Sequence, residues 1–352
     1  MDAIRDVGVP GVAAEVREGD RRIVARSGVA ELRAHRPMPY DGTFRIASNT
    51  KVFVATLALL LVGEGRLSLD DTVERHLPGL VTGHRNDGRR ITVRDLLQHT
   101  SGLTDYGADL PIRSGADFAR EHLRTYRPEQ LVAMSMRHAP GWYPGPGERR
   151  FGYSNVNYVL TGMIIERITG DTWEHGVRDR IAAPLGLRRT YGPGTRPLLP
   201  RPHARTYFRF PGEPLIDTTI LNASVVDAAG AMVSTLDDLN SFLRALIGGR
   251  LLKSPELNLM RRTIFAAEDA LQELYPGTRY GLGLMRRPLT CGGTYWSHVG
   301  EGISGATRNG VTSNAHRSVA IHMTTEASIP STRKRQEAAA ANLIDQALCG
   351  HL

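Results

Sequence analysis

Strand-like segments lie at the two ends of this chain, and helix-like segments lie between them. Near the N-terminus, residues 11–16 and 22–30 are largely apolar runs joined by a polar turn, which is typical of a β-hairpin. Four further strand-like runs lie near the C-terminus, at residues 281–285, 293–298, 305–309 and 318–323. Because strands need partners, we expect one sheet assembled from both ends of the chain, with the middle inserted into it.

Helical patterns fill the middle of the chain. From residue 48, apolar residues recur at helical spacing until glycines at 63 and 65 end the pattern. The Pro- and Gly-rich stretch 140–147 is expected to be a loop. The other expected helices are residues 92–97, 128–139, 158–169, 172–183, 235–247 and 334–348.

These segments predict an α/β (α+β) fold, an antiparallel sheet with flanking helices and an inserted, mostly helical region. We expect a sheet domain of residues 1–64 and 265–352 and a helical domain of residues 65–264. The functional site is expected at their interface, because the motifs described below come from both parts of the 352-residue chain.

Composition excludes several classes of function. The formal charge of +8 suggests nucleic acid, but the arginines are scattered and no binding motif accompanies them. The longest apolar run, residues 52–62, is too short to span a bilayer. No signal-peptide pattern follows Met1. We therefore expect neither a nucleic-acid nor a membrane partner, and a cytoplasmic location unless a leader has been removed.

Lysine is rare in this chain, because only three of the 44 basic residues are lysines, namely Lys51, Lys253 and Lys334. Lysine, unlike arginine, can lose its proton in a protein and act as a base. Lys51 follows Ser48 by three residues, so the two side chains share a helix face. A serine becomes nucleophilic when a nearby base takes its proton. The pair is a candidate nucleophile and base; a capping serine followed by a surface lysine is the alternative.

Two more motifs bear chemically useful side chains. A Tyr-Ser-Asn motif begins at Tyr153, and a tyrosine beside an ammonium group can have its pKa lowered and serve as a base. Asn155 offers a donor and an acceptor to a substrate amide. His298, followed by Val299 and Gly300, ends a predicted strand and could face the nucleophile with a polar or positive group. A structural role for this histidine is the alternative.

Cys291 and Cys349 are the two cysteines of the chain. They fit either two buried thiols or one disulfide that closes a long loop, and the sequence pattern leaves both open. Two cysteines do not form a zinc site by themselves. We expect no metal and no cofactor.

The order and flanks of these motifs resemble the penicillin-binding, β-lactamase-like serine hydrolases. The resemblance is strongest to class C β-lactamases and to the D-alanyl-D-alanine carboxypeptidases with an H-T-G motif. It extends from Gly11 to Gly350, and it places the cysteines like a disulfide pair of those carboxypeptidases. The motifs are Phe44-Arg45-Ile46-Ala47-Ser48-Asn49-Thr50-Lys51, Leu96-Leu97-Gln98-His99-Thr100-Ser101-Gly102-Leu103, Tyr153-Ser154-Asn155, Gly281-Leu282-Gly283-Leu284 and His298-Val299-Gly300.

The resemblance implies a β-lactamase/transpeptidase-like fold and a serine acyl-enzyme mechanism. In that mechanism Ser48 attacks a carbonyl carbon, and Lys51 and Tyr153 share the proton transfers. Asn155 holds the acyl side chain. The backbone N–H groups of Ser48 and Glu301 form an oxyanion hole, which stabilises charge in the transition state.

Two positions depart from the carboxypeptidases, in which an arginine and the threonine of H-T-G bind the substrate's terminal carboxylate. Val299 has no hydroxyl, and it follows His298, which stands where many relatives carry a lysine. Alignment puts Met285 at the arginine position. Arg287 shares its side of the strand, whereas Arg286 points away. Losing charged contacts predicts an ester or amide acyl donor without a free carboxylate there; carboxylate binding through Arg287 is the alternative.

Glu301 is a third departure, since the carboxypeptidases have a neutral threonine there. We expect Glu301 either to orient an amine acceptor or to point to solvent. The first option predicts an acyltransferase that forms an amide from a small-molecule donor. Transacylases of natural-product pathways, such as the capuramycin type, are compatible with this expectation. Transfer to water makes the protein a hydrolase.

Three alternatives accompany this reading. Two are enzymes, a D-alanyl-D-alanine carboxypeptidase and a class C-type β-lactamase. The third is a non-catalytic penicillin-binding sensor. A sensor would be expected to lose Ser48, Lys51 or Tyr153, and all three are present.

Overall fold

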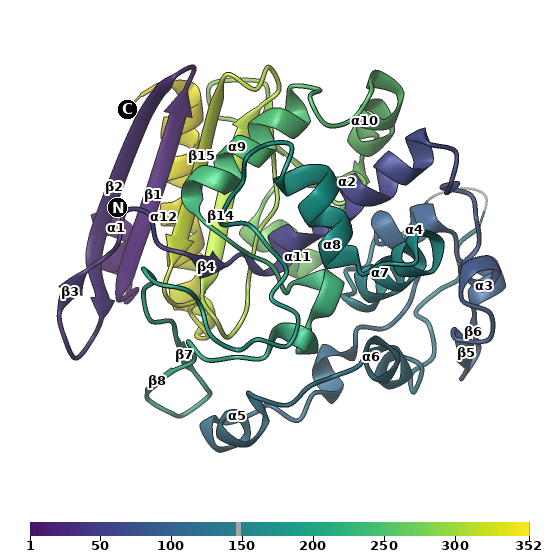
Figure 1. Ribbon diagram of the computed structural model, residues 1–352. Coiled ribbons are helices and arrows are strands. Elements are labelled where there is room, and N and C mark those ends of the chain that lie inside the picture. Colours follow the sequence, from purple (N-terminus) through teal and green to yellow (C-terminus); the bar gives the residue numbers. More distant parts are fainter. Residues whose placement is uncertain (146–148, 352) are drawn as a thin grey trace.

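The computed structural model describes residues 1–145 and 149–351, and a nine-stranded antiparallel sheet is its largest element (Figure 1). The strands come from both ends of the chain, as the sequence predicts. In order across the sheet they are β10 (Ile264–Phe265), β11 (Arg279–Tyr280), β12 (Met285–Pro288), β13 (Thr294–Ser297), β14 (Ala306–Thr312), β15 (Arg317–Met323), β1 (Gly11–Glu18), β2 (Arg21–Glu31) and β3 (Arg36–Pro37).

Strand β1 joins the two ends of the chain, because it pairs with β2 on one side and with β15 on the other. Side chains alternate between the faces of a strand. Val12 and Ala14 accordingly pack in a cluster with Ile344 of the C-terminal helix, and Ala13 belongs to the core on the opposite face. Both faces of the sheet are therefore covered at this strand.

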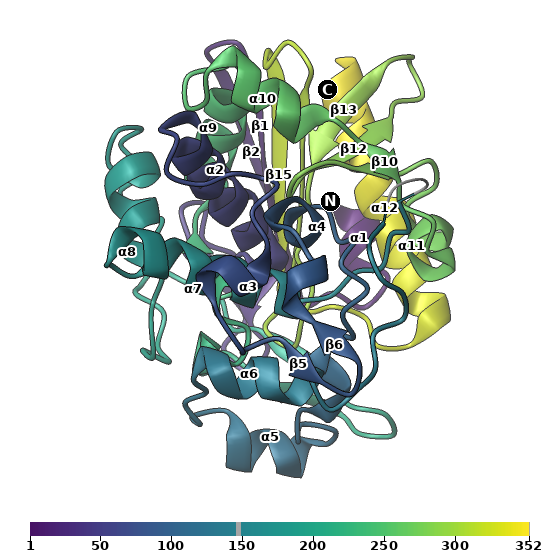
Figure 2. The ribbon, with the colours of Figure 1, turned by 90° about the vertical axis from the view of Figure 1, so that its right-hand side faces the viewer.

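The helices occupy both faces of the sheet (Figure 2). In that view α9, α2 and α8 lie on one side of β15, and α12 lies on the other. The helices are α1 (Asp2–Arg5), α2 (Thr50–Gly63), α3 (Val73–His76), α4 (Val93–Leu97), α5 (Gly115–Glu121), α6 (Pro128–Ser135), α7 (Val156–Thr169), α8 (Trp173–Val177), α9 (Leu236–Ile247), α10 (Ser254–Arg261), α11 (Asp269–Leu274) and α12 (Pro330–Cys349).

Short elements complete the middle of the chain. The helix expected over 172–183 is divided into α8 and a π-helical turn, and the one expected over 128–139 ends at Ser135. The remaining strands are β4 (Phe44–Arg45), β5 (Thr82–Gly83), β6 (Asn86–Asp87), β7 (Tyr207–Arg209), β8 (Leu215–Asp217) and β9 (Val233–Ser234). The short turns are η1 (Ala47–Asn49), η2 (Gly88–Arg90), η3 (Tyr106–Asp109), η4 (Arg178–Ala182), η5 (Ala223–Val225) and η6 (Asp227–Ala229).

The strand expected over 281–285 is wrong, because residues 281–284 form the turn between β11 and β12. Gly283 has a φ of 74°, and a Cβ atom there would lie 2.5 Å from the Cβ of Ala55 in α2. The glycines therefore let this turn approach the helix rather than extend a strand. The loop expected over 140–147 is irregular through residue 145, and its last two residues lie outside the described part.

Helix α9 lies within the expected inserted region, yet it packs against β1, β14 and β15 of the sheet. It also contributes Phe242 and Leu243 to the large core. The middle of the chain is thus interleaved with the sheet at this helix. The division at residues 64/65 and 264/265 stays a prediction.

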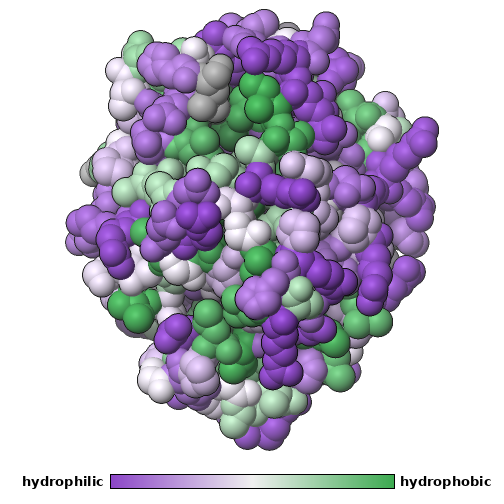
Figure 3. Space-filling model, turned by 90° about the vertical axis from the view of Figure 1, so that its left-hand side faces the viewer, coloured by the Kyte–Doolittle hydropathy of each residue, from purple (hydrophilic) through white to green (hydrophobic). Residues whose placement is uncertain are grey.

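The side of the molecule that carries β2 is largely polar (Figure 3). Arg21, Arg22 and Arg26 of β2 are exposed there. Hydrophilic side chains surround smaller hydrophobic patches on this face, which agrees with arginines scattered along the sequence. Among the described helices, none is long and apolar enough to cross a membrane.

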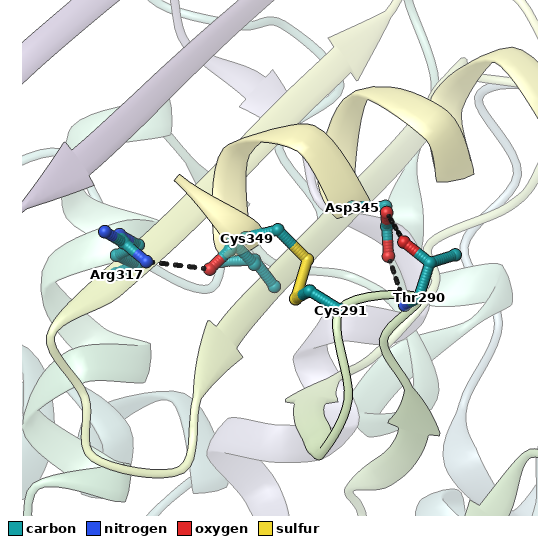
Figure 4. The surroundings of a disulfide bond; sticks show 6 residues. Thr290, Cys291, Arg317, Asp345 and Cys349 are labelled. Atoms are coloured by element: carbon teal, nitrogen blue, oxygen red, sulfur yellow. Dashed lines mark hydrogen bonds between the residues drawn. A yellow bond between two sulfur atoms is a disulfide. The ribbon is translucent and has the colours of Figure 1, made fainter. Parts of the chain in front are cut away.

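Cys291 and Cys349 form a disulfide (Figure 4), which decides between the two alternatives that the sequence left open. It joins the turn after β12 to the last residue of α12. Beside it, the backbone N–H of Thr290 donates to Asp345 of the same helix at 2.8 Å. A cross-link of this kind typically stabilises a fold by about 2–4 kcal/mol. Helix α12 is therefore fixed to the strands that border the site described next.

Candidate active site

Ser48 lies at a strained turn where β4 leads into α2. Ala47 has a φ of 47°, which is rare for a residue with a side chain. The neighbouring Asn49 and Thr50 hold this turn, since the Asn49 side chain donates to the Ile46 carbonyl at 3.0 Å and Thr50 Oγ1 to the Ala47 carbonyl at 2.8 Å. Strain of this kind is characteristic of functional sites.

Lys51 reaches back from the first turn of α2 to Ser48, as the spacing predicts. Its Nζ donates to Ser48 Oγ at 3.0 Å, to Asn155 Oδ1 at 2.8 Å and to the carbonyl oxygen of Ala229 at 2.7 Å. Lys51 is fully buried, and burial lowers its pKa to about 7, although Asp105 nearby opposes the shift. A lysine with this pKa can take a proton from serine near neutral pH.

Tyr153 lies beside the pair, with its ring centroid 4.9 Å from Lys51 Nζ. The expectation of a lowered tyrosine pKa is wrong, because burial raises the pKa of Tyr153 well above its usual value. A hydrogen bond with Ser48 opposes this shift only in part. In the free protein Tyr153 therefore holds its proton, and Lys51 is the better base.

Asn155 is the N-cap residue of α7, and it connects Lys51 to Asp105, which the motifs did not indicate. Its Nδ2 donates to Asp105 Oδ2 at 2.9 Å, and its backbone N–H donates to the same oxygen at 2.6 Å. Both ends of the amide thus have partners within the protein, and the expected role of holding the acyl side chain stays a prediction. Asp105 is a single aspartate in a loop, so no sequence pattern distinguishes it.

His298 is completely buried between two partners. Its Nδ1 donates to the Val299 carbonyl at 2.7 Å, and its Nε2 accepts from the Tyr280 hydroxyl at 3.0 Å. Burial lowers the pKa of His298 to about 3, and the charge of Lys51 adds to the effect. The histidine is therefore neutral, which leaves the polar rather than the positive group of the expectation, and its role opposite the nucleophile stays a prediction.

The backbone around Glu301 fits the expected oxyanion donor. Within residues 1–145 and 149–351, the Glu301 N–H has no hydrogen-bond acceptor. The Ser48 N–H belongs to the first turn of a helix, where N–H groups lack partners in the helix. Gly300 approaches the Ser48 turn closely, because a Cβ atom there would lie 2.4 Å from the Ile46 carbonyl oxygen.

The Glu301 side chain is neither free nor directed only to solvent. Its Oε1 accepts from the Tyr275 hydroxyl at 2.7 Å and from Arg308 at 3.0 Å, and its Oε2 accepts from Arg333. Burial raises the pKa of Glu301, but the two guanidinium groups outweigh burial and lower it. The carboxylate is balanced by two arginines, which weakens its attraction for an amine acceptor, and that expected role stays a prediction.

Two cavities meet at Ser48, Asn155 and Glu301. The first, the acyl-side cavity, has about 240 Å³, and the second, the Tyr153-side cavity, has about 360 Å³. The first is lined by Arg45, Ala47, Ser48, Gly107, Leu110, Ile112, Asn155, Leu221, Ala223, Val225, Val226, Ala229, Gly230, Glu301, Gly302, Ile303 and Ser304. The second is lined by Ser48, Tyr153, Asn155, Glu268, Ala270, Leu271, Leu274, Tyr275, Met285, Val299, Glu301 and Arg333.

The Tyr153-side cavity contains both positions that depart from the carboxypeptidases. Met285 and Val299 line it as expected and give this wall an apolar surface. Arg287 does not compensate, because its guanidinium lies over the rings of Tyr275 and Tyr295, at 4.8 and 5.5 Å, away from the lining. The arginine on this wall is Arg333 of α12, which sequence spacing did not indicate.

The model of the family described as Beta-lactamase matches residues 2–343. The chain belongs to the β-lactamase family. Penicillin-binding protein 4 of Amycolatopsis lactamdurans is 33% identical over 193 residues, which cover 54% of this chain and 47% of that protein. Penicillin-binding protein 4* of Bacillus subtilis is 34% identical over 164 residues, 46% of this chain and 33% of that protein. The matched segments span less than half of each relative.

Two solved structures of the β-lactamase fold match nearly the full chain. A D-stereospecific amidohydrolase from Streptomyces sp. is 37% identical, with a TM-score of 0.85 over 96% of this chain and 98% of that chain. The D-amino acid amidase of Ochrobactrum anthropi SV3 is 30% identical, with a TM-score of 0.79 over 97% and 98%. The resemblance inferred from the motifs is thus confirmed, and the protein is a member of a serine hydrolase family.

Replacing Lys51 by arginine is expected to slow acylation of Ser48 strongly in this β-lactamase-family protein. Arginine keeps a positive charge but does not give up its proton, so the base is lost. The rate of acyl-enzyme formation with an activated ester should fall by about 10²–10⁴-fold. Mass spectrometry of the protein measures this adduct. The matched control is Lys334→Arg, an exposed lysine that should acylate at the wild-type rate.

The pH dependence of acylation should report the pKa of Lys51, which is about 7. The base works unprotonated, so kcat/KM for ester cleavage should rise with pH up to about 7 and level off above it. Below that point it should fall by about tenfold per pH unit. The pKa of His298 is about 3 and that of Tyr153 lies above its usual value, so neither interferes. A profile that is flat from pH 5 to 9 would contradict this role of Lys51.

Proposed function

We propose that this protein is a serine amidohydrolase and acyltransferase. It takes an acyl group from an amide or ester that lacks a free carboxylate on the leaving-group side, and passes it to water or an amine. The observation that carries the proposal is the 3.0 Å contact between Ser48 Oγ and a buried Lys51 of lowered pKa, at the junction of two cavities.

Acylation begins with the neutral Lys51 amine, which accepts the Ser48 hydroxyl proton as Oγ bonds to the substrate carbonyl carbon. Negative charge moves to the carbonyl oxygen. The N–H groups of Ser48 and Glu301 stabilise this charge, and they require no reorganisation because the surrounding backbone fixes them. The three acceptors around Lys51 then stabilise its ammonium form.

The tetrahedral intermediate collapses when the C–N or C–O bond to the leaving group breaks. The leaving group takes a proton, which Lys51 supplies through the Tyr153 hydroxyl. A protonated tyrosine suits this relay, because it can donate one proton and receive another. In deacylation, water or an amine attacks the ester carbon and gives its proton to Lys51 and Tyr153. The bond to Ser48 Oγ then breaks, and Ser48 regains its proton.

The Tyr153-side cavity supports a donor without a terminal carboxylate. A carboxylate site gains from bidentate arginine contacts, and Met285 and Val299 provide none. The Arg333 guanidinium on this wall already pairs with Glu301 and Glu326. The Streptomyces and Ochrobactrum neighbours carry the names amidohydrolase and D-amino acid amidase, which supports amides of D-amino acids as donors.

Transfer to an amine is the second candidate function, and Glu268 favours it. This half-buried carboxylate lines the Tyr153-side cavity and accepts from the Tyr153 backbone N–H at 3.3 Å. In the part of the chain that the structure describes, no basic side chain forms an ion pair with it. An incoming cationic amine finds here the negative charge that Glu301 does not offer.

The donor class is tested by comparing a D-amino acid amide and its ester with a peptide that ends in D-Ala-D-Ala. We expect kcat/KM for the amide and ester to exceed that for the peptide by at least about tenfold, because one charge-assisted hydrogen bond is worth about 1.5–3 kcal/mol. Ser48→Ala is the blank for each substrate. Faster cleavage of the peptide would overturn the proposed donor.

The acceptor is tested by partitioning a single ester between water and an added diamine. Glu268→Gln should lower the ratio of aminolysis to hydrolysis by about tenfold, in the range of one charge-assisted contact, while total turnover without amine stays at the wild-type level. Glu273→Gln, which removes an exposed carboxylate of α11, is the matched control. An unchanged product ratio in the Glu268 variant would rule out this acceptor site.

A further inference from the structure

A buried ionic cluster lies behind the oxyanion donor. Arg308 of β14 is almost wholly inaccessible to solvent, and so is its partner Glu337 of α12. The guanidinium Nε donates to Glu337 Oε2 at 2.7 Å, and Nη2 donates to the other oxygen, so the pair is bidentate. The Tyr275 hydroxyl lies 2.9 Å from Glu337 and 2.7 Å from Glu301. The cluster thus joins the C-terminal helix to the edge of the site.

One arm of Arg308 points at the backbone of the site rather than at a carboxylate. Its Nη1 donates to the carbonyl oxygen of Gly300 at 2.7 Å, and the Thr307 N–H donates to the same oxygen at 2.9 Å. That oxygen belongs to the peptide unit whose N–H is the N–H of Glu301. A trans peptide is planar, so its C=O and N–H point in opposite directions. Holding the oxygen therefore aims the N–H.

The next peptide of this segment is held as well. The Gly302 N–H donates to Glu326 at 2.7 Å, and Glu326 pairs with Arg333 at 3.1 Å. The Glu301 side chain between them is bound by Arg308 and Arg333. Of the three N–H groups in residues 300–302, only that of Glu301 has no acceptor among the described residues, and the backbone is fixed on both sides of it.

Burying an arginine with a glutamate costs desolvation energy, and an apolar pair of similar volume would often serve stability as well. A cation on a peptide oxygen has a separate effect, since it draws electron density from the N–H and strengthens that group as a donor. Chains of hydrogen bonds polarise one another in this way in a low dielectric. The positive charge of Arg308 therefore strengthens the Glu301 N–H, which faces the developing oxyanion.

We propose that Arg308 is a positioning residue of the oxyanion hole, which orients and polarises the Gly300–Glu301 peptide from behind. This inference rests on the proposed acyl-enzyme function. Arg308 touches neither substrate nor Ser48, and Glu337 holds it from helix α12, which the Cys291–Cys349 disulfide attaches to the sheet. Helix α12 therefore contributes to transition-state stabilisation through its Glu337, which holds Arg308.

The test uses the double variant Arg308→Met with Glu337→Leu, which removes both charges together and leaves neither one buried alone. An activated ester of a D-amino acid gives the acylation rate constant and the dissociation constant separately in single-turnover experiments. We expect the rate constant to fall by about 10–100-fold, somewhat less than the loss of an oxyanion donor, which costs about 10²–10³. The dissociation constant should stay within about twofold, because the ground state does not use the oxyanion charge.

Two further measurements separate an effect on the orientation of the Glu301 N–H from a general loss of structure. A boronic acid that forms a tetrahedral adduct with Ser48 should bind the double variant more weakly, in proportion to the lost acylation rate, whereas a non-covalent D-amino acid should bind equally well. The carbonyl stretching frequency of the acyl-enzyme should rise, because a weaker donor polarises the carbonyl less. Arg308→Lys keeps the charge in place and should recover part of the loss in each readout.

Matched controls keep the outcome interpretable. Arg17→Met with Glu15→Leu removes a partly buried ion pair of β1, two strands away from β14, and should leave acylation unchanged. If the double variant fails to fold, the lysine variant alone carries the test. A wild-type protein that forms no adduct at Ser48 overturns the proposed function and this inference with it. A wild type that acylates while both Arg308 variants match it in rate and boronate affinity overturns only the role of Arg308.

Discussion

The burial of the Lys51 ammonium group among three oxygen acceptors is the interaction on which the rest of the site depends. Each acceptor comes from a different part of the chain, namely Ser48, Asn155 and Ala229. Desolvation lowers the pKa of Lys51 to about 7, and the three contacts place its lone pair beside the serine when the proton leaves. The turn that carries Ser48, helix α7 and the segment around Ala229 must all be in place before this lysine can act as the proposed base.

On the other side of the reacting carbonyl, the group that faces the substrate is a backbone N–H and not a titratable side chain. In the proposed mechanism the backbone N–H of Glu301 is the donor there, and the charged side chains of Arg308, Glu337 and Arg333 lie behind it. These charged groups form ion pairs with one another and with Glu301, and the proposed role of Arg308 is to orient the N–H. His298, which a family pattern assigns to a charged position, is neutral and hydrogen-bonded. The site combines a neutral base with a neutral, preorganised donor.

The proposed specificity rests on the contacts that the cavity walls lack. Met285 and Val299 leave the Tyr153-side cavity without the carboxylate contacts of the carboxypeptidase pattern, and Arg287 lies over two tyrosine rings instead. Glu268 adds a negative charge to the same wall. The proposed leaving group or acceptor, an amine without a carboxylate, is consistent with this composition. The amidohydrolase and amidase neighbours have names consistent with that chemistry.

The sequence by itself determined the sheet built from both ends, the pairing of Ser48 with Lys51, and the family, because each rests on local periodicity or on motifs in fixed order. It misplaced residues 281–284, whose glycines serve an approach to α2 that no local pattern encodes. Only the tertiary structure decided the pKa directions of Tyr153 and His298, since burial depends on neighbours far away in the chain. It alone showed Asp105, Glu268 and Arg308, single charged residues whose meaning comes from what they contact.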